Sequence, residues 1–172
     1  LWTGSSGWWN WERRFVEWAE REGFTVDVAI DADLDGVPDL LDDYEVLLTV
    51  GHNEYWTRPM RDAVDAFVDR GGRWAIFSGN TAFWQVRYDE PGQMTAYKGR
   101  AHVDDPVRGS DRRHLLTSVW SDPSIGHPET TTTGLTFSRG GYHRVGLAVT
   151  DGTGAYDVHE PGHWAFAGTG LG

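Results

Sequence analysis

The sequence predicts an α/β fold, in which a parallel sheet is flanked by helices. The main observation is that residues 44–79 show a strand pattern, a helix pattern and a second strand pattern in succession. A length of about 36 residues is typical of a βαβ unit, whose crossover is right-handed and whose strands run parallel. A helix pattern and a strand pattern come before this unit, and loops rich in glycine, proline and threonine follow it.

The first part of the chain predicts a helix and then a strand. Apolar side chains recur with the spacing of one helix face over residues 8–21. Alternate apolar positions at 24–30 predict a strand, and the acidic residues 31–43 predict a loop. The tryptophans expected to pack in the core or between elements are Trp8, Trp9, Trp11 and Trp18. Because the pattern opens on a helix, we expect a strand before it in a longer protein.

The βαβ unit is the most clearly marked part of the sequence. Residues 44–50 form a nearly unbroken apolar run, which is typical of a strand buried on both faces. Thr57 is the predicted N-cap of the following helix, and Pro59 suits its first turn. The predicted buried face of this helix consists of Met60, Val64, Phe67 and Val68. A pair of glycines then ends the helix before the second strand, residues 73–79.

Beyond Asn80 the pattern becomes irregular. Glycine, proline and threonine are frequent, and short alternating runs such as residues 144–149 predict strands. We expect loops and antiparallel strands packed at one side of the sheet. We interpret the chain as a single domain that is a fragment of a longer one, with an α/β core at 1–90 and an irregular, β-rich part at 91–172.

The composition of the chain excludes several classes of function. The formal net charge is −11, so we expect neither nucleic acid nor a membrane as a partner, because both are bound through basic surfaces. The chain has no cysteine, which excludes thiolate metal sites and cysteine nucleophiles. No apolar run reaches the roughly 18 residues of a membrane span. Ten tryptophans favour a packed globular body.

Three polar residues are expected at one edge of the predicted sheet. His52 and Glu54 come just past the first strand of the βαβ unit, and Asn80 comes just past the second. Ligands of open parallel sheets bind where the strands end, so these side chains are predicted to face one small molecule. Two alternatives remain open: a polar connection without chemistry, and an Asn80 that caps the next turn or takes a left-handed backbone.

The acidic loop contains a partial calcium-binding pattern. The residues that match the first half of an EF-hand loop are Asp31, Asp33, Asp35 and Gly36. Position 12 is Asp42 in place of glutamate, and a predicted strand precedes the loop where an EF-hand has a helix. Residues 31–39 therefore allow two interpretations, a calcium site or an acidic loop that leads into a short helical turn.

The segment from residue 47 to residue 87 resembles a known family. It contains GHxEYW at 51–56, a helix that ends in two glycines, and GNxxxWxxR at 79–87. This arrangement is similar to the large (beta) subunit of N,N-dimethylformamidase and its bacterial relatives. Further agreement is found at Tyr97-Lys98, at Pro128-Glu129 with Gly134, and in the closing FAGTGLG. The resemblance therefore extends over nearly the whole chain.

The resemblance implies a catalytic domain with a glutamine-amidotransferase-like (flavodoxin-like) fold. Such a domain hydrolyses the C–N bond of a small amide at a mononuclear ferric centre, which two tyrosines and one glutamate hold. Glu54 matches the glutamate ligand, His52 and Asn80 match residues around the substrate, and Lys98 is transferred as a third catalytic residue. The family's tyrosines lie upstream of GHxEYW, so we expect them outside this chain, which alone would be inactive.

The resemblance also carries expectations about partners and location. It implies a small amide as substrate, an oligomer with a small subunit among its components, and a bacterial cytoplasmic location. The alternative from another class of function is a non-catalytic binding module on the same fold, stabilised by calcium at residues 31–39.

Overall fold

The computed structural model describes residues 7–136 and 159–170. The chain divides into two compact units, Leu1–Arg139 and Gly140–Gly172. Within its described residues the second unit contains a short 3-10 helix, Trp164–Phe166. The predicted strand at 144–149 lies outside the described residues. The elements below belong to the first unit.

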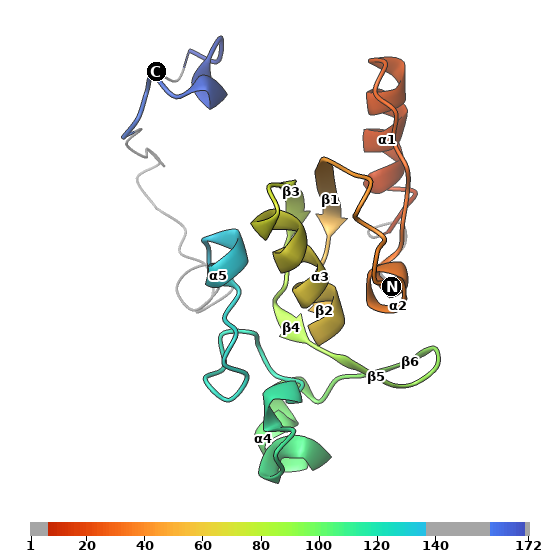
Figure 1. The fold of residues 1–172 in the computed structure, drawn as a ribbon, viewed down its shortest axis with the longest axis vertical. Helices are drawn as coiled ribbons and strands as arrows, with labels where there is room; N and C mark the ends of the chain where they lie inside the picture. Colours follow the sequence, from red (N-terminus) through yellow and green to blue (C-terminus); the bar gives the residue numbers. More distant parts are fainter. Residues whose placement is uncertain (1–6, 137–158, 171–172) are drawn as a thin grey trace. The chain divides into compact units, whose positions relative to one another are not determined.

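The predicted βαβ unit is confirmed (Figure 1). Strand β1 (Val46–His52), helix α3 (Arg58–Asp69) and strand β3 (Arg73–Gly79) follow one another. The two strands pair in parallel, and the register runs from Val46 opposite Arg73 to His52 opposite Gly79. The carboxyl ends of both strands therefore lie at the same edge.

Local signals in the sequence account for helix α3. Oγ1 of Thr57 accepts a hydrogen bond from the main-chain N–H of Met60 over 3.3 Å, which satisfies one free donor of the first turn. The predicted buried face is seen with one change: Met60, Val64 and Phe67 are fully buried, and Val68 is 36% exposed. Gly71 has φ 98° directly after the helix, a backbone conformation that suits glycine.

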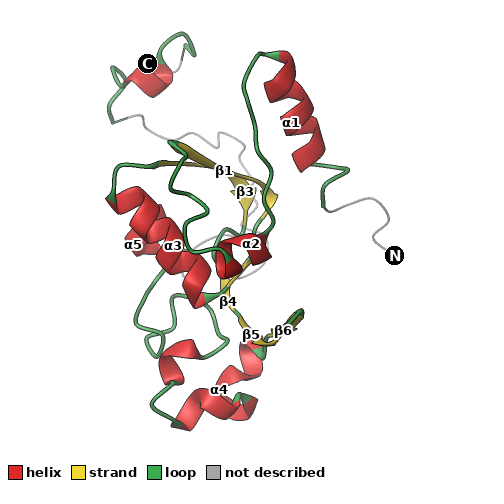
Figure 2. Ribbon diagram, turned by 45° about the vertical axis from the view of Figure 1, so that its right-hand side comes forward, coloured by secondary structure: helices red, strands yellow, loops and turns green. Residues whose placement is uncertain are grey.

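Helix α1 (Glu12–Arg21) lies on the opposite face of the small sheet from α3 (Figures 1 and 2). The ring of Phe15 contacts the ring of Phe77 on β3 from this side. The helix begins four residues later than predicted, because residues 8–11 form turns. Trp8 (40% exposed), Trp9 (70% exposed) and Trp18 (44% exposed) lie outside the core. Trp18 nevertheless packs between elements as predicted, because the centre of its ring lies 6.2 Å from that of Phe24.

Two predictions about strands need correction. Residues 24–30 form no strand here, and Phe24 and Ile30 are more than half exposed. Alternation indicates which side chains share a face, but it does not supply a hydrogen-bonding neighbour. Strand β1 is buried on one face only: Leu47 packs against the core, while Val46 and Leu48 on the other face are exposed. Among the described strands β1 pairs with β3 alone.

The predicted acidic loop begins with helix α2 (Asp31–Gly36), and turns follow it up to residue 43. The carboxylate of Asp33 accepts a hydrogen bond from the main-chain N–H of Ile30 over 2.9 Å. An aspartate in the first turn stabilises a helix start, because it faces the free N–H groups there. This cap explains why a short helix forms where composition alone predicts a loop.

Short elements complete the unit. Strand β2 (Tyr55–Trp56) pairs in parallel with β4 (Trp84–Gln85), and β5 (Arg87–Glu90) forms an antiparallel hairpin with β6 (Gln93–Thr95). The short helices that follow are Lys98–Arg100, α4 (Ala101–Asp104), Pro106–Gly109, Arg113–Leu115 and α5 (Thr130–Thr133). Beyond Asn80 the described residues contain the predicted loops and one antiparallel pair, β5 with β6. After residue 91 short helices outnumber strands, so the described residues of this part are not β-rich.

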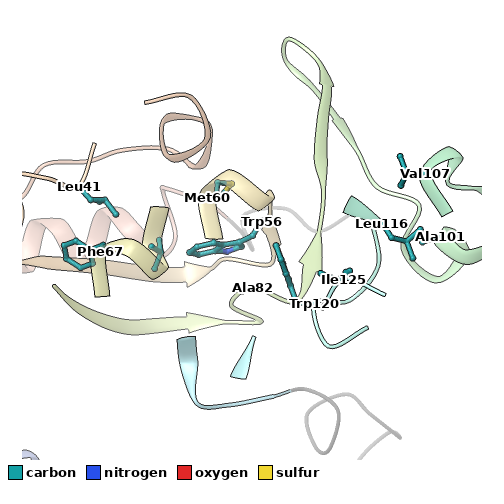
Figure 3. Close-up of a cluster of buried hydrophobic side chains, with 11 residues drawn as sticks. Leu41, Trp56, Met60, Phe67, Ala82, Ala101, Val107, Leu116, Trp120 and Ile125 are labelled. Carbon is teal, nitrogen blue, oxygen red and sulfur yellow. The ribbon is translucent and has the colours of Figure 1, made fainter. Parts of the chain in front are cut away.

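The hydrophobic core joins α3 to the segments that follow the sheet (Figure 3). Trp56, Met60 and Trp120 are each fully buried and belong to one cluster. A buried ion pair supports the same region: Arg87 donates from Nη1 and Nη2 to the two carboxylate oxygens of Asp105, over 2.9 and 3.0 Å. The cluster ties the irregular part of the unit to the βαβ unit.

The described residues form a mixed α/β fold with two-stranded sheets flanked by helices. The α/β class is therefore confirmed, and a larger flavodoxin-like sheet is not seen among these residues. No helix in the described part of the chain is long and apolar enough to cross a membrane.

Candidate functional site

The structure brings His52, Glu54 and Asn80 together at the carboxyl edge of β1 and β3. His52 is the last residue of β1, and Asn80 follows Gly79, the residue paired with His52. Nδ2 of Asn80 lies 3.2 Å from Nε2 of His52, and Oε2 of Glu54 lies 3.7 Å from the same nitrogen. The predicted convergence is seen, and the roles of the three residues in catalysis stay predictions.

The contact between Asn80 and His52 indicates where the imidazole proton lies. An amide nitrogen only donates, so Nε2 of a neutral His52 accepts and Nδ1 carries the proton. Asn80 also has φ 55°, and its carbonyl oxygen accepts from the N–H of Phe83 over 3.1 Å. The left-handed turn and the place in the site, which the sequence left as alternatives, therefore occur together.

Trp84 holds the carboxylate of Glu54 in one orientation. Its indole Nε1 donates to Oε1 over 2.9 Å, while the Glu54 side chain is only 16% exposed. Oε1 is thereby engaged, and Oε2 faces His52. Trp84 is present in the GNxxxWxxR pattern, but spacing alone did not assign its indole a partner.

Lys98, the fourth predicted residue, joins the site through aromatic rings. Its Nζ donates to Oη of Tyr55 over 2.6 Å and lies 4.6 Å from the centre of that ring. The same ammonium lies 5.7 Å from the centre of the Trp84 ring, which is a cation–π distance. Lys98 therefore contacts the residues that surround Glu54.

The start of helix α1 supplies two residues that the sequence did not assign to the site, Trp11 just before the helix and Glu12 as its first residue. The ring of Trp11 stacks on the imidazole of His52, with centroids 6.2 Å apart and an interplanar angle of 23°. Oε1 of Glu12 lies so close to Gly51 that a Cβ there would be 2.6 Å away, and Gly51 has φ 86°. Only glycine is compatible with both conditions. In the sequence, the glycine of the GHxEYW motif is the one indication that another segment approaches the backbone here.

The acidic residues near this edge form separate contacts and do not surround a common centre. Oδ1 of Asp31 accepts from Nδ2 of Asn53 over 3.2 Å, and Asp35 accepts from the hydroxyl of Thr57. Burial raises the pKa of Asp31; the hydrogen bond from Asn53 opposes this shift and the nearby Glu12 carboxylate adds to it. An EF-hand loop wraps its ligands around one ion. Asp33 caps the main-chain N–H of Ile30, while Asp31 and Asp35 bond to Asn53 and Thr57, so among the described residues these aspartates do not form a group with metal-ligand spacing.

A second cluster of polar residues has the spacing of a metal site. Among the residues the structure describes, Asp62, Asp65 and His127 form the one group whose ligand atoms all lie within 4.8 Å of one another. Nδ1 of His127 lies 2.5 Å from Nη1 of Arg58, and Nε2 lies 2.6 Å from Oδ2 of Asp65. A guanidinium only donates, so Nδ1 accepts and Nε2 of the neutral ring carries the proton. A metal at Nε2 would have to displace these contacts.

From the sequence, His127 is predicted to be an ordinary loop residue without a site. The aspartates at 62 and 65 share a face of α3, and this spacing is the only local signal for the cluster. Helix α5 is tied to the same face, because the hydroxyl of Thr132 contacts Asp65 and accepts from Nη2 of Arg61 over 3.0 Å. The cluster therefore joins two regions that are distant in the sequence.

Comparison with known proteins places the chain in a family. Residues 2–172 match the family described as N,N-dimethylformamidase beta subunit-like, C-terminal. The chain belongs to this family. It is 32% identical over 110 residues to the N,N-dimethylformamidase beta subunit of Paracoccus aminophilus and 31% identical over 109 residues to that of Alcaligenes sp. Each match covers 63% of this chain, which spans about 13% of the length of either relative.

Proposed function

We propose that the protein containing this chain hydrolyses the C–N bond of a small, N-substituted amide at His52, Glu54 and Asn80. The observation that carries the proposal is their convergence: Nε2 of His52 lies 3.2 Å from the Asn80 amide and 3.7 Å from the Glu54 carboxylate. The named activity of the relatives, a dimethylformamidase, supports the choice of an amide as substrate.

The geometry supports a role for His52 in moving protons. Its Nε2 is unprotonated in the neutral ring, and with Oε2 of Glu54 it forms a pair of acceptors 3.7 Å apart. The lone pair of Nε2 accepts from Asn80 here, so the attacking water donates first to Oε2 of Glu54 and reaches Nε2 when the Asn80 N–H turns away. His52 takes the proton of this water as it attacks the carbonyl carbon, and later returns a proton to the departing amine.

Asn80 can stabilise the charge that develops on the carbonyl oxygen. Its amide has two N–H bonds, one of which is directed to Nε2 of His52. The second is available to the carbonyl oxygen of a substrate, and a fixed donor of this kind strengthens as the oxygen becomes negative. The left-handed turn at Asn80 holds the side chain at this edge.

We propose Glu54 as one ligand of a ferric ion. Its carboxylate is a hard oxygen donor, one oxygen is oriented by Trp84, and Oε2 remains available. The group of Asp62, Asp65 and His127 does not include Glu54. The two tyrosine ligands of this proposal are those that the family resemblance places upstream of GHxEYW. When bound, the metal supplies Lewis acid chemistry to the amide carbonyl.

The activity, the oligomer and any partner subunit belong to the whole protein and are part of the same proposal. The relatives are called beta subunits, which supports assembly with another kind of subunit. Because the tyrosine ligands lie outside this chain in the proposal, the 172 residues alone are expected to release no amine from an amide.

Formate release from N,N-dimethylformamide and related N-alkylformamides by the full-length protein tests this function. The variant His52→Ala is expected to lower kcat about 10²- to 10⁴-fold, the usual effect of losing a general acid–base. His102→Ala is a matched control, since His102 pairs with Asp122 over 2.5 Å and is 60% exposed at its side chain. Equal formate release by the two variants would overturn the proposal.

A further inference from the structure

We propose that Trp84 is a positioning residue that fixes which carboxylate oxygen of Glu54 faces the site. This inference rests on the proposed function, in which Glu54 acts at the reacting centre. The indole Nε1 donates to Oε1 over 2.9 Å, while Oε2 lies 3.7 Å from Nε2 of His52. Because Oε1 is engaged, Oε2 is the oxygen that a water, a substrate or a metal meets.

Trp84 holds Glu54 at two points. Besides the indole contact, the main-chain N–H of Trp84 donates to the carbonyl oxygen of Glu54 over 2.9 Å. This bond belongs to the pairing of β2 with β4, which places Tyr55 opposite Trp84. One residue thus fixes both the backbone and the side chain of Glu54, so the carboxylate keeps its orientation without a ligand.

The indole itself has little freedom to move. Its ring packs edge-on against Phe83, with centroids 4.9 Å apart and an interplanar angle of 72°. The ammonium of Lys98 lies 5.7 Å from the ring centre, and Trp84 also forms an antiparallel bridge with Val119. A donor held on several sides orients its acceptor at little entropic cost, which is how residues behind a reactive carboxylate tune it.

Trp74 offers a matched control for the loss of an indole hydrogen bond. Its Nε1 donates to Oγ1 of Thr49 over 3.2 Å, and that contact does not involve Glu54. In the full-length protein, Trp84→Phe keeps a ring and removes the donor. We expect it to lower kcat for amide hydrolysis about 10- to 100-fold with little change in KM, the range found for partners behind a ligand. Trp74→Phe is expected to leave kcat unchanged.

A second measurement does not depend on activity or on the folding of the Trp84 variant. With ¹⁵N-labelled indoles, Glu54→Ala is expected to shift the Trp84 Nε1–H resonance and to speed its exchange with solvent, and to leave the Trp74 signal in place. Equal kcat for Trp84→Phe and Trp74→Phe, or a Trp84 signal that ignores Glu54→Ala, would overturn the inference. A protein that releases no formate but whose Trp84 signal responds would overturn the proposed function and support the contact.

Discussion

Besides the exposed His102–Asp122 pair, two clusters among the described residues pair an imidazole with a carboxylate. They are the strand-end cluster of His52, Glu54 and Asn80 and the α3–α5 cluster around Asp65 and His127, and they differ in the partners of the imidazole. In the strand-end cluster, Nε2 of His52 lies 3.2 Å from the neutral Asn80 amide and 3.7 Å from Oε2 of Glu54. At the α3–α5 contact, both ring nitrogens of His127 have close charged partners, at 2.5 Å from Arg58 and 2.6 Å from Asp65.

The difference shows why residue types alone do not identify a site. In the α3–α5 cluster both ring nitrogens of the histidine are engaged by charged groups, and the contacts hold two segments of the chain together. The strand-end cluster differs, because its imidazole contacts a neutral amide and Trp84 engages only one oxygen of its carboxylate, so Oε2 of Glu54 can still bind water or substrate. Both clusters contain a histidine and a carboxylate. What separates the chemistry proposed at His52 from the structural role proposed for His127 is a carboxylate oxygen that is still able to accept a hydrogen bond.

The largest expected effect is on catalysis at the strand-end cluster. Asn80→Ala removes the donor that faces the carbonyl oxygen, and kcat is expected to fall about 10²- to 10³-fold, as for the loss of one oxyanion donor. Steady-state kinetics of the full-length protein measure this. A change below about threefold would place Asn80 outside the chemistry and leave it a turn residue.

The most completely bonded carboxylate, Asp105, is expected to affect stability through pH. Burial favours its protonated form, but hydrogen bonds from Arg87, Thr117 and Val107 outweigh this and lower its pKa from 3.8 to about 2. A lowered pKa stabilises the fold above pH 3.8, and this stability is lost as pH falls towards 2. The contribution is about 2 kcal/mol.

Urea denaturation between pH 7 and pH 2 checks this expectation. Asp105→Asn should lower the free energy of unfolding at pH 7 and reduce its dependence on pH below 4. If the variant and the wild type lost stability in parallel as the pH fell, the carboxylate would not be the group responsible.

At the α3–α5 cluster the expected effect is on stability. His127→Ala removes one partner each from Arg58 and Asp65, although Arg58 keeps the carbonyl of Ile125 and Asp65 keeps Thr132. The loss of partners for partly buried polar groups costs about 1–3 kcal/mol. Thermal unfolding should show a lower Tm, while kcat for amide hydrolysis stays unchanged. A large fall in kcat with an unchanged Tm would reverse the roles that we give to the two clusters.

The smallest effect is expected at the ring stacked on His52. Trp11→Leu removes an aromatic contact worth about 0.5–1.5 kcal/mol, so kcat/KM should fall about two- to tenfold. Because Trp11 lies just before α1, the change tests whether this helix start shapes the site. No change in kcat/KM would show that the stack only covers His52.

Much of the βαβ unit and its edge follows from local signals in the sequence. Short stretches of sequence are enough to predict the cap at Thr57, the buried face of α3 and the apolar runs of β1 and β3. The pairing of the two strands then brings His52 and Asn80 together. Topology therefore converts local patterns into a prediction about distant residues.

The parts that the sequence did not reveal depend on tertiary contacts. The stacking of Trp11 on His52 and the link between His127 and Asp65 join segments with no shared periodicity. The segment 24–30 alternates as a strand does, yet alternation does not supply a hydrogen-bonding neighbour. The indole of Trp84 gains its role only from the register of β2 with β4.

Iron stoichiometry in two variants of the full-length protein tests the central claim most directly. Both Glu54→Ala and Asp65→Ala remove one carboxylate, one from each cluster. If the strand-end cluster carries the chemistry, Glu54→Ala loses the bound iron and formate release, and folded Asp65→Ala keeps both. Retention of iron by Glu54→Ala together with its loss from Asp65→Ala would contradict the account.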